Sequence, residues 1–312
     1  MRITFYGNFG VSYSSESHHA KSLEALGHTV VRLQEPSTPA EQIYDEASAS
    51  EVLVWIKTHG WDTPGMDRVL AELRQRRIPI ISYHLDAYMP IPERWARYRN
   101  DPYMMGLDHF FTCDRLMAEW LNENTPVRGH YTPAGVFGEE CYLADQHDHP
   151  FGNDVLFTGQ YHYHDIWPYR PQLIDWLRET YGDRFTRVAG DTPAGTVRGH
   201  QLNYLYASSK VVVGDSLCLN YTYPDYWSDR VYEVMGRGGF LIMPRIQGLE
   251  RSFEDAIHLC YYDFGDFDQL KYLIDYYLDH DAEREAIRRA GHEQVKNNHT
   301  YVHRWQQILD TL

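Results

Sequence analysis

The first half of the chain alternates short apolar runs with amphipathic stretches. The apolar runs predict strands at Ile3–Tyr6, Thr29–Leu33, Glu51–Lys57, Pro79–His84, His109–Cys113 and Val127–Tyr131. Apolar residues at helical spacing predict helices at Ser17–Leu26, Met66–Arg76 and Arg115–Asn122. Strands that alternate with helices indicate right-handed crossovers, and therefore a parallel sheet.

The polar segment Gly138–Asn153 has no hydrophobic periodicity and interrupts this pattern, so we predict an inter-domain linker there. A second alternating series follows it. The predicted strands are Asp154–Phe157, Phe185–Val188, Lys210–Val213, Phe240–Met243 and Ile257–Tyr261. The predicted helices are Pro171–Thr180, Leu202–Ala207, Asp229–Arg237, Phe267–Asp279, Ala282–Asn297 and a last one at Val302–Leu312.

The two series predict an α/β protein of two Rossmann-like, doubly wound domains that face a cleft, the GT-B arrangement. The expected boundaries are residues 1–140 for the first domain and 153–300 for the second, with a helix at 301–312 packing back on the first. Ligands of open parallel sheets bind at the carboxyl ends of the strands. We therefore expect an active site between the domains.

Composition narrows the class of protein. The 312 residues are 43% hydrophobic and 23% charged, and the formal net charge is −15. That charge disfavours general binding to nucleic acid, which needs a positive surface. No apolar run reaches the length of a membrane span or resembles a secretion signal, so we expect a cytoplasmic protein. The four cysteines show no CxxC spacing, which disfavours a zinc knuckle or redox pair.

The segment from Ser228 to Gly239 carries the clearest chemistry. Ser228 is a good helix N-cap, and Arg230 then falls in the first turn, where free N–H groups attract an anion. Glu233 lies three residues further along, on the same side of the helix. Gly238 and Gly239 end the helix and allow a close turn into the next strand. By spacing alone, a surface helix with a Glu–Arg pair is an equally good interpretation.

The same segment resembles GT-B glycosyltransferases, in particular the spore-maturation-protein-like and glycosyl transferase group 1-like proteins. The resemblance rests on the pattern Ser-x-Arg-x-x-Glu-x-x-x-x-Gly-Gly at residues 228–239. It extends over roughly residues 153–312, through Asp154-Val-Leu-Phe-Thr-Gly159, Arg170, Gly248-Leu-Glu, Tyr261-Tyr-Asp and His299-Thr-Tyr-Val-His-Arg304. The first half matches mainly through Tyr83-His-Leu-Asp86, Phe111-Thr-Cys-Asp114 and Pro133-Ala-Gly135.

The resemblance implies a donor site for a nucleotide-diphosphate sugar in the second domain. It implies that Ser228 and Arg230 hold the diphosphate, that Glu233 holds the ribose and that Gly159 lets the backbone approach the donor. Arg170 is a candidate for a second phosphate cation, with a solvated surface arginine as the alternative. No cofactor and no metal are expected. Two histidine-containing segments, His147-Asp-His149 and His162-Tyr-His164-Asp165, are read as loop residues rather than metal ligands.

Transfer also needs a group beside the acceptor hydroxyl, such as a general base. Candidates lie where strands of the first domain end. We favour Asp86, followed by His84, Glu16 and His19, although each also fits a structural polar role. Gly7-x-x-Gly10 is not the dinucleotide fingerprint, so a nicotinamide enzyme is poorly supported.

The sequence thus predicts a metal-independent glycosyltransferase that moves a sugar from a nucleotide-diphosphate donor to an acceptor hydroxyl. The sequence does not identify the acceptor, which is a protein, a glycan or a small molecule. It also does not identify the donor sugar, the nucleotide base, or whether the anomeric configuration is retained or inverted. Two alternatives remain: a GT-B sugar-nucleotide epimerase and a non-catalytic two-lobed sugar-binding protein.

Overall fold

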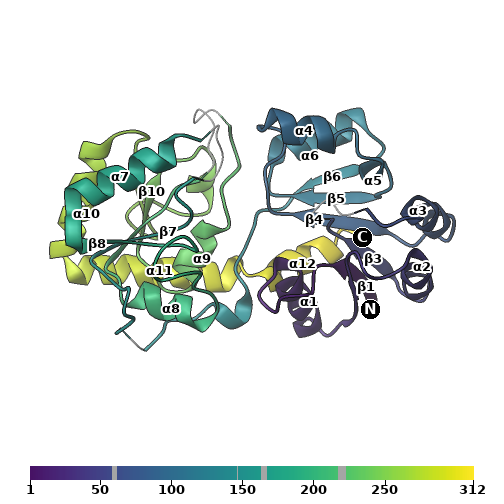
Figure 1. Cartoon of the computed structure of the whole chain (residues 1–312), viewed down its shortest axis with the longest axis horizontal. Coiled ribbons are helices and arrows are strands. Elements are labelled where there is room, and N and C mark those ends of the chain that lie inside the picture. The colour runs from purple at the N-terminus through teal and green to yellow at the C-terminus, as the bar shows by residue number, and fades with distance from the viewer. Residues whose placement is uncertain (58–61, 146, 163–166, 217–222) are drawn as a thin grey trace. The chain divides into compact units, whose positions relative to one another are not determined.

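The computed structural model describes residues 1–57, 62–145, 147–162, 167–216 and 223–312. The chain divides into two compact units (Figure 1). The first is formed by Met1–Phe137 together with Tyr301–Leu312, and the second by Gly138–Thr300. Each unit contains one parallel sheet flanked by helices, so the predicted fold class is confirmed.

The first unit has a six-stranded parallel sheet in the order β2-β1-β3-β4-β5-β6. Its strands are β1 (Arg2–Gly7), β2 (Thr29–Gln34), β3 (Val52–Trp55), β4 (Ile80–His84), β5 (His109–Thr112) and β6 (Arg128–Tyr131). Its helices are α1 (Ser15–Ala25), α2 (Ala40–Ser48), α3 (Met66–Gln75), α4 (Pro92–Tyr98), α5 (Pro102–Met105), α6 (Arg115–Asn124) and α12 (Tyr301–Leu309).

Side chains at successive strand positions point to opposite faces of the sheet, so they pack in two separate cores. On β3, Val52 and Val54 pack on the face covered by α1 and α12. The intervening Leu53, with Trp55, packs on the face covered by α2, α3 and α6. A strand buried on both faces reads as a continuous apolar run, which is why the sequence revealed it.

The last helix, α12, lies beside α1 although 275 or more residues separate them in sequence (Figure 1). Trp305 is fully buried, and its Nε1 donates to Nδ1 of His19 over 3.1 Å. The backbone N–H of Tyr301 donates to the carbonyl of Val136 over 2.9 Å. The end of the chain is therefore part of the first unit's core.

The second unit has a five-stranded parallel sheet in the order β11-β10-β9-β7-β8. Its strands are β7 (Val155–Thr158), β8 (Phe185–Val188), β9 (Val211–Val213), β10 (Leu241–Pro244) and β11 (Cys260–Tyr262). Its helices are α7 (Tyr169–Tyr181), α8 (His200–Ala207), α9 (Arg230–Gly236), α10 (Phe267–Asp279) and α11 (Asp281–Asn298).

The predicted linker 138–153 is not a free connection. It begins with a 3-10 turn at Gly138–Glu140, and Arg237, 2% exposed, forms an ion pair with Glu140. Asn203 accepts from Arg237 over 2.9 Å and donates to the carbonyl of Glu140 over 2.8 Å. These buried polar contacts make the segment part of the second unit. The sequence missed them because the partners are more than 30 residues apart.

Every predicted strand and helix has a counterpart, but the sequence did not predict α2, α4 and α5. In α2 only Ile43 and Ala47 are buried, so the apolar stripe is too short to stand out. No residue of α4 is buried, and α5 has four residues. Short or exposed helices give little periodic signal.

The position of Trp305 generates the first testable prediction. Replacing it with alanine leaves a cavity against the rings of Phe5 and Tyr83, both 6.1 Å away between centroids. We expect a loss of about 3–5 kcal/mol in the unfolding free energy, measured by urea denaturation. The neighbouring exposed Gln306→Ala is the control; equal midpoints for the two variants would contradict the assignment of Trp305 to the core.

Candidate functional site

The strand order of the second sheet reverses direction between β7 and β9. From β7 the chain first adds β8 on one side, then returns to add β9, β10 and β11 on the other. The crossover helices on the two sides diverge at such a point and leave a crevice beyond the carboxyl ends of the strands. Residues that follow β7 and β9 are therefore the first candidates for a ligand site.

The guanidinium of Arg230 lies at this reversal point. Its Nη1 donates to Oγ1 of Thr158, the last residue of β7, over 2.9 Å. Both terminal nitrogens lie 3.3 Å from the position a Cβ would take on Gly159, whose φ is +149°. A side chain there would crowd the guanidinium, and the positive φ itself favours glycine. The structure thus brings together two of the predicted donor-site residues.

Two polar atoms around Arg230 lack partners. Its Nε and the Oγ of Ser228 are buried, with no hydrogen-bond partner among the residues that the structure describes. A buried donor without a partner costs roughly 1–3 kcal/mol. An anion bound at this place would satisfy a guanidinium N–H and a hydroxyl together. This is the structural feature that best fits a phosphate group.

Ser228 is not the helix cap that the sequence predicted. Helix α9 begins at Arg230, Asp229 precedes it as the cap residue, and no side chain of the cap bonds to the first turn. The backbone N–H of Ser228 instead donates to Oγ of Ser216, just beyond β9, over 3.0 Å. Because α9 has only seven residues, we attribute anion binding to the side-chain donors rather than to the helix end.

Glu233 lies within α9, whereas Gly238 and Gly239 follow the end of that helix. Glu233 lies one turn after Arg230, its side chain is 34% exposed, and it approaches Arg237 to 3.8 Å. Gly238 has a φ of +83°, and its carbonyl accepts from Arg288 over 2.8 Å. A side chain on Gly239 would lie 2.7 Å from Val234. The glycines therefore serve the turn into β10, while only Glu233 is on the side of Arg230.

Arg170 forms a buried ion pair. Its Nε and Nη2 donate to the two carboxylate oxygens of Asp215 over 2.8 and 2.9 Å, and its side chain is 5% exposed. The sequence suggested a phosphate cation or a solvated arginine. The structure instead gives Arg170 a bidentate partner on the loop after β9, which leaves it poorly suited to a ligand.

Arg187, on β8, is a cation that the sequence analysis missed. Its Nη1 donates to the carbonyl of Gly159 over 3.1 Å, and its two terminal nitrogens pair with Asp191 at 2.9 Å. It therefore fixes the turn on which the guanidinium of Arg230 rests. Nothing in the local sequence marks it, because the contact depends on β8 pairing with β7.

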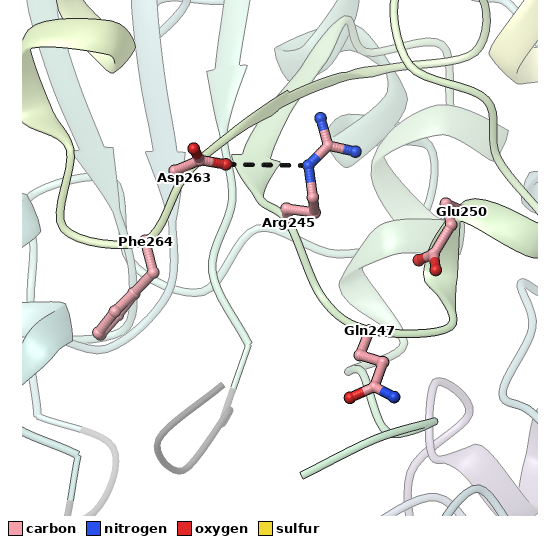
Figure 2. Close-up of a pocket in the computed structure, with 5 residues that line it drawn as sticks. All are labelled: Arg245, Gln247, Glu250, Asp263 and Phe264. Atoms are coloured by element: carbon pink, nitrogen blue, oxygen red, sulfur yellow. Dashed lines mark ion pairs between the residues drawn. The ribbon is translucent and has the colours of Figure 1, made fainter. Parts of the chain in front are cut away.

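A pocket of about 420 Å³ opens at the carboxyl ends of β10 and β11 (Figure 2). Arg245, Gln247, Glu250, Asp263 and Phe264 line it. Figure 2 shows the side chain of Arg245 between Asp263 and Glu250, with its Nε 3.9 Å from Asp263. The ring of Phe264 is 39% exposed. An accessible aromatic ring beside polar side chains suits a planar, hydrogen-bonding group.

In the first unit, two of the predicted catalytic groups are buried and neutral. Burial lowers the pKa of His84 to about 3, and its ring nitrogens lie within 3.1 Å of the hydroxyls of Tyr88 and Tyr98. Burial likewise lowers the pKa of His19 to about 3, and the ring accepts from Trp305. Such weak bases are poor proton acceptors at neutral pH. Both histidines fit a structural role in the core.

The two predicted carboxylates, Asp86 and Glu16, differ in how deeply they are buried. Asp86 is half-buried in the turn after β4. Glu16 is 3% exposed, and its Oε1 has no partner among the described residues. The sequence analysis missed Glu35, which follows β2, is 1% exposed and accepts from Nε1 of Trp55. Burial, with the nearby charge of Glu16, raises the pKa of Glu35 to about 7.

Within the described part of the chain, no three His, Cys, Asp or Glu side chains form a group that could hold a metal ion. His147 contacts the carbonyl of Ala207, and His149 accepts from the N–H of Phe151. His164 and Asp165 lie outside the described residues. No described helix is both long and apolar enough to cross a membrane.

Comparisons with known proteins bear on the fold and on the class of protein. Residues 170–310 match the family model described as glycosyl transferase-like. No curated protein matches the chain in sequence. Three solved structures of similar fold are described next.

An alpha-glucosyltransferase solved with UDP-glucose and DNA containing an abasic site superposes with a TM-score of 0.72 at 11% identity, over 100% of this chain and 99% of that one. HepE of Anabaena with UDP-glucose gives 0.65 at 12% identity, over 100% and 99%. The sucrose-phosphate synthase of Thermosynechococcus elongatus gives 0.63 at 12%, over 100% and 98%. The match over residues 170–310 agrees with the glycosyltransferase class predicted from the sequence. The solved structures confirm the predicted fold, GT-B.

The perturbed carboxyl of Glu35 generates a pH-dependent prediction. Its pKa rises from 4.5 to about 7 on folding, so the folded state favours the protonated form. This stabilisation is complete below pH 4.5 and is lost as the pH rises through 7, by about 3 kcal/mol at most. We expect Glu35→Gln, which keeps an acceptor for Trp55, to match the natural protein at pH 4.5 and to be more stable at pH 8.5.

Urea unfolding at the two pH values measures this effect. Glu46→Gln, at a partly exposed carboxyl of α2, is the control and should show no such divergence. If the unfolding free energies of Glu35→Gln and the natural protein differ by the same amount at both pH values, folding does not raise the pKa of Glu35.

Proposed function

We propose that the second unit binds a nucleotide-diphosphate sugar, with its diphosphate at Arg230 and Gly159. One observation carries the proposal: a guanidinium fixed at the reversal point of the sheet, beside two buried polar atoms that lack partners, Nε of Arg230 and Oγ of Ser228. A diphosphate supplies several strong acceptor oxygens, and charge-assisted hydrogen bonds to arginine are among the stronger ones in proteins.

The pocket at β10 and β11 suits the base of the nucleotide. Neighbouring strands lie about 4.8 Å apart, so the carboxyl ends of β10 and β7, separated by β9, are about 10 Å apart. A nucleoside diphosphate can span that distance, with the base against Phe264 and the diphosphate at Arg230. Glu233, one turn along α9, then remains our candidate for the ribose hydroxyls.

This donor site supports transfer chemistry by stabilising the leaving group. When the bond from the anomeric carbon to the diphosphate breaks, negative charge develops on the diphosphate oxygens. A fixed guanidinium favours that charged state more than the neutral ground state, which is how electrostatic catalysis works. Metal independence and a cytoplasmic location remain predictions from the sequence.

For the group beside the acceptor hydroxyl, the candidates remain those that the sequence predicted in the first unit. Of the four predicted candidates we keep Asp86 and Glu16, because His84 and His19 are buried and neutral. Incubation with UDP-sugars separates the alternatives. Slow release of UDP favours transfer, and isomerisation of the UDP-sugar favours an epimerase. Binding of free sugar without any nucleotide affinity favours a sugar-binding protein.

Arg230→Ala tests the diphosphate site. Removing a charged hydrogen-bond donor costs roughly 1.5–3 kcal/mol, so UDP should bind about ten- to a hundredfold more weakly by calorimetry. Turnover of the donor should be abolished with little loss of stability, because Arg230 fills no core volume.

The matched control is Arg184→Ala, just before β8, where the side chain is 55% exposed and pairs with Asp154. It should bind UDP as the natural protein does. Unchanged affinity in Arg230→Ala would overturn the diphosphate assignment.

Phe264→Ala tests the base pocket separately. Stacking of a base on an aromatic ring contributes about 1–3 kcal/mol, so UDP affinity should fall by at least fivefold. Inorganic pyrophosphate, which lacks a base, should inhibit or compete equally well in both proteins. An equal loss for pyrophosphate would show that Phe264 acts on the diphosphate site or on the fold.

A further inference from the structure

The guanidinium of Arg230 packs on three consecutive neutral residues at the end of β7. Its Nη1 donates to Oγ1 of Thr158 over 2.9 Å, and its Cζ lies 5.9 Å from the ring centroid of Phe157. Both terminal nitrogens approach the backbone of Gly159. An aromatic face attracts a cation, and a hydroxyl accepts from it. These contacts hold the guanidinium without cancelling its charge.

The partners of Arg230 differ in charge from those of two other arginines in the same unit. Arg170 and Arg237 each form an ion pair with a buried carboxylate. Arg230 forms no ion pair with any residue that the structure describes. Glu233, one turn along the same helix, approaches Arg237 to 3.8 Å instead. An arginine whose partner is neutral keeps its positive charge available to an anion.

The hydroxyl of Thr158 is itself held in place by Tyr206 on α8. The two hydroxyl oxygens are 3.1 Å apart, Tyr206 is 1% exposed and Thr158 is 8% exposed. A guanidinium only donates, so Oγ1 of Thr158 accepts from Arg230, and it bonds to Tyr206 whichever of the two hydroxyls donates. Two partners in different directions fix the orientation of the threonine side chain.

Tyr206 adds no negative charge to this arrangement. Burial raises the pKa of its hydroxyl, and the charge of Glu233 raises it further, whereas the hydrogen bond to Thr158 and the charge of Arg230 lower it. The net pKa lies above the ordinary value, so the phenol stays protonated at neutral pH. A phosphate therefore meets a cation that has no anionic competitor on this side.

The hydroxyl of Thr158 also decides which way Arg230 points. Residues three apart on a helix can meet, so an arginine released from Thr158 could pair with Glu233. That ion pair would neutralise the charge that a ligand needs. With the bond to Thr158 in place, the guanidinium is directed to the end of β7, where its Nε and the Oγ of Ser228 are buried without partners.

We propose that Thr158 and Tyr206 are positioning residues of the diphosphate site, which keep the guanidinium of Arg230 at the end of β7 with its charge unpaired. Tyr206 acts on Arg230 through Thr158. This inference rests on the proposed donor function and adds two residues to it that neither the motif at residues 228–239 nor the pocket at β10 and β11 contains.

Thr158→Val tests the proposal, because valine has the shape of threonine without the hydroxyl. Calorimetry of the full chain should show UDP binding about tenfold more weakly, and inorganic pyrophosphate should weaken by the same factor. Thr158→Ser restores the hydroxyl and should bind both probes within about twofold of the natural protein. A loss of packing alone would not be rescued by the smaller serine.

Tyr206→Phe tests the second residue by removing one oxygen from a buried ring. It should weaken both probes by about threefold or more, since Thr158 keeps its bond to Arg230 but loses its support. Two matched controls should bind both probes normally. Thr186→Val removes a hydroxyl of β8 that accepts from Asn153 over 3.1 Å, and Tyr181→Phe removes one that donates to Asp275 over 3.1 Å.

A double-mutant cycle separates positioning from a general effect on the fold. If Thr158 acts through Arg230, Thr158→Val should cause no further loss of affinity in the Arg230→Ala background. Losses that simply add would overturn the proposal. So would a Thr158→Val variant that binds as Thr186→Val does, or a Thr158→Ser variant that binds no better than Thr158→Val.

The outcomes also distinguish this proposal from the donor function itself. If UDP binds the natural protein and Arg230→Ala weakens it while Thr158→Val and Tyr206→Phe do not, only the positioning role is wrong. If neither UDP nor pyrophosphate binds the natural protein or raises its melting temperature, the diphosphate site is wrong and the positioning role fails with it.

Discussion

The proposed donor site depends on the packing of one guanidinium against one glycine. A side chain on Gly159 would crowd the guanidinium of Arg230 where it donates to Thr158, and Arg187 donates to the carbonyl of Gly159. These residues come from β7, β8 and α9, so the paired strands determine where the cation lies. A charge placed by backbone geometry needs little rearrangement when an anion arrives, which favours stabilisation of a departing diphosphate.

The two sheets share one topological feature. Each reverses its strand order near its first strand. Among the described residues, buried polar atoms without a hydrogen-bond partner lie near both reversals: on Ser228 and Arg230 in the second unit, and on Glu16 and Glu35 in the first.

Several polar residues that look catalytic in the sequence hold the structure together instead. Arg170 closes a bidentate ion pair with Asp215, and His19 accepts from Trp305 at the docking site of the last helix. His84 is enclosed by tyrosines. Each of them is removed from water, and the hydrogen-bond partners of Arg170 and His84 leave those two side chains little to offer a ligand. A sequence motif cannot distinguish such a residue from one that faces a site.

The sequence by itself determined the two parallel sheets and, through the resemblance, the class of protein, because those depend on local periodicity and on a motif read along the chain. Only the tertiary structure decided that Arg230 lies beside Gly159, that Arg187 supports that turn, that residues 138–153 belong to the second unit and that Glu35 is buried. These facts rest on contacts between residues far apart in sequence. Strand order and burial create them, and neither leaves a local trace.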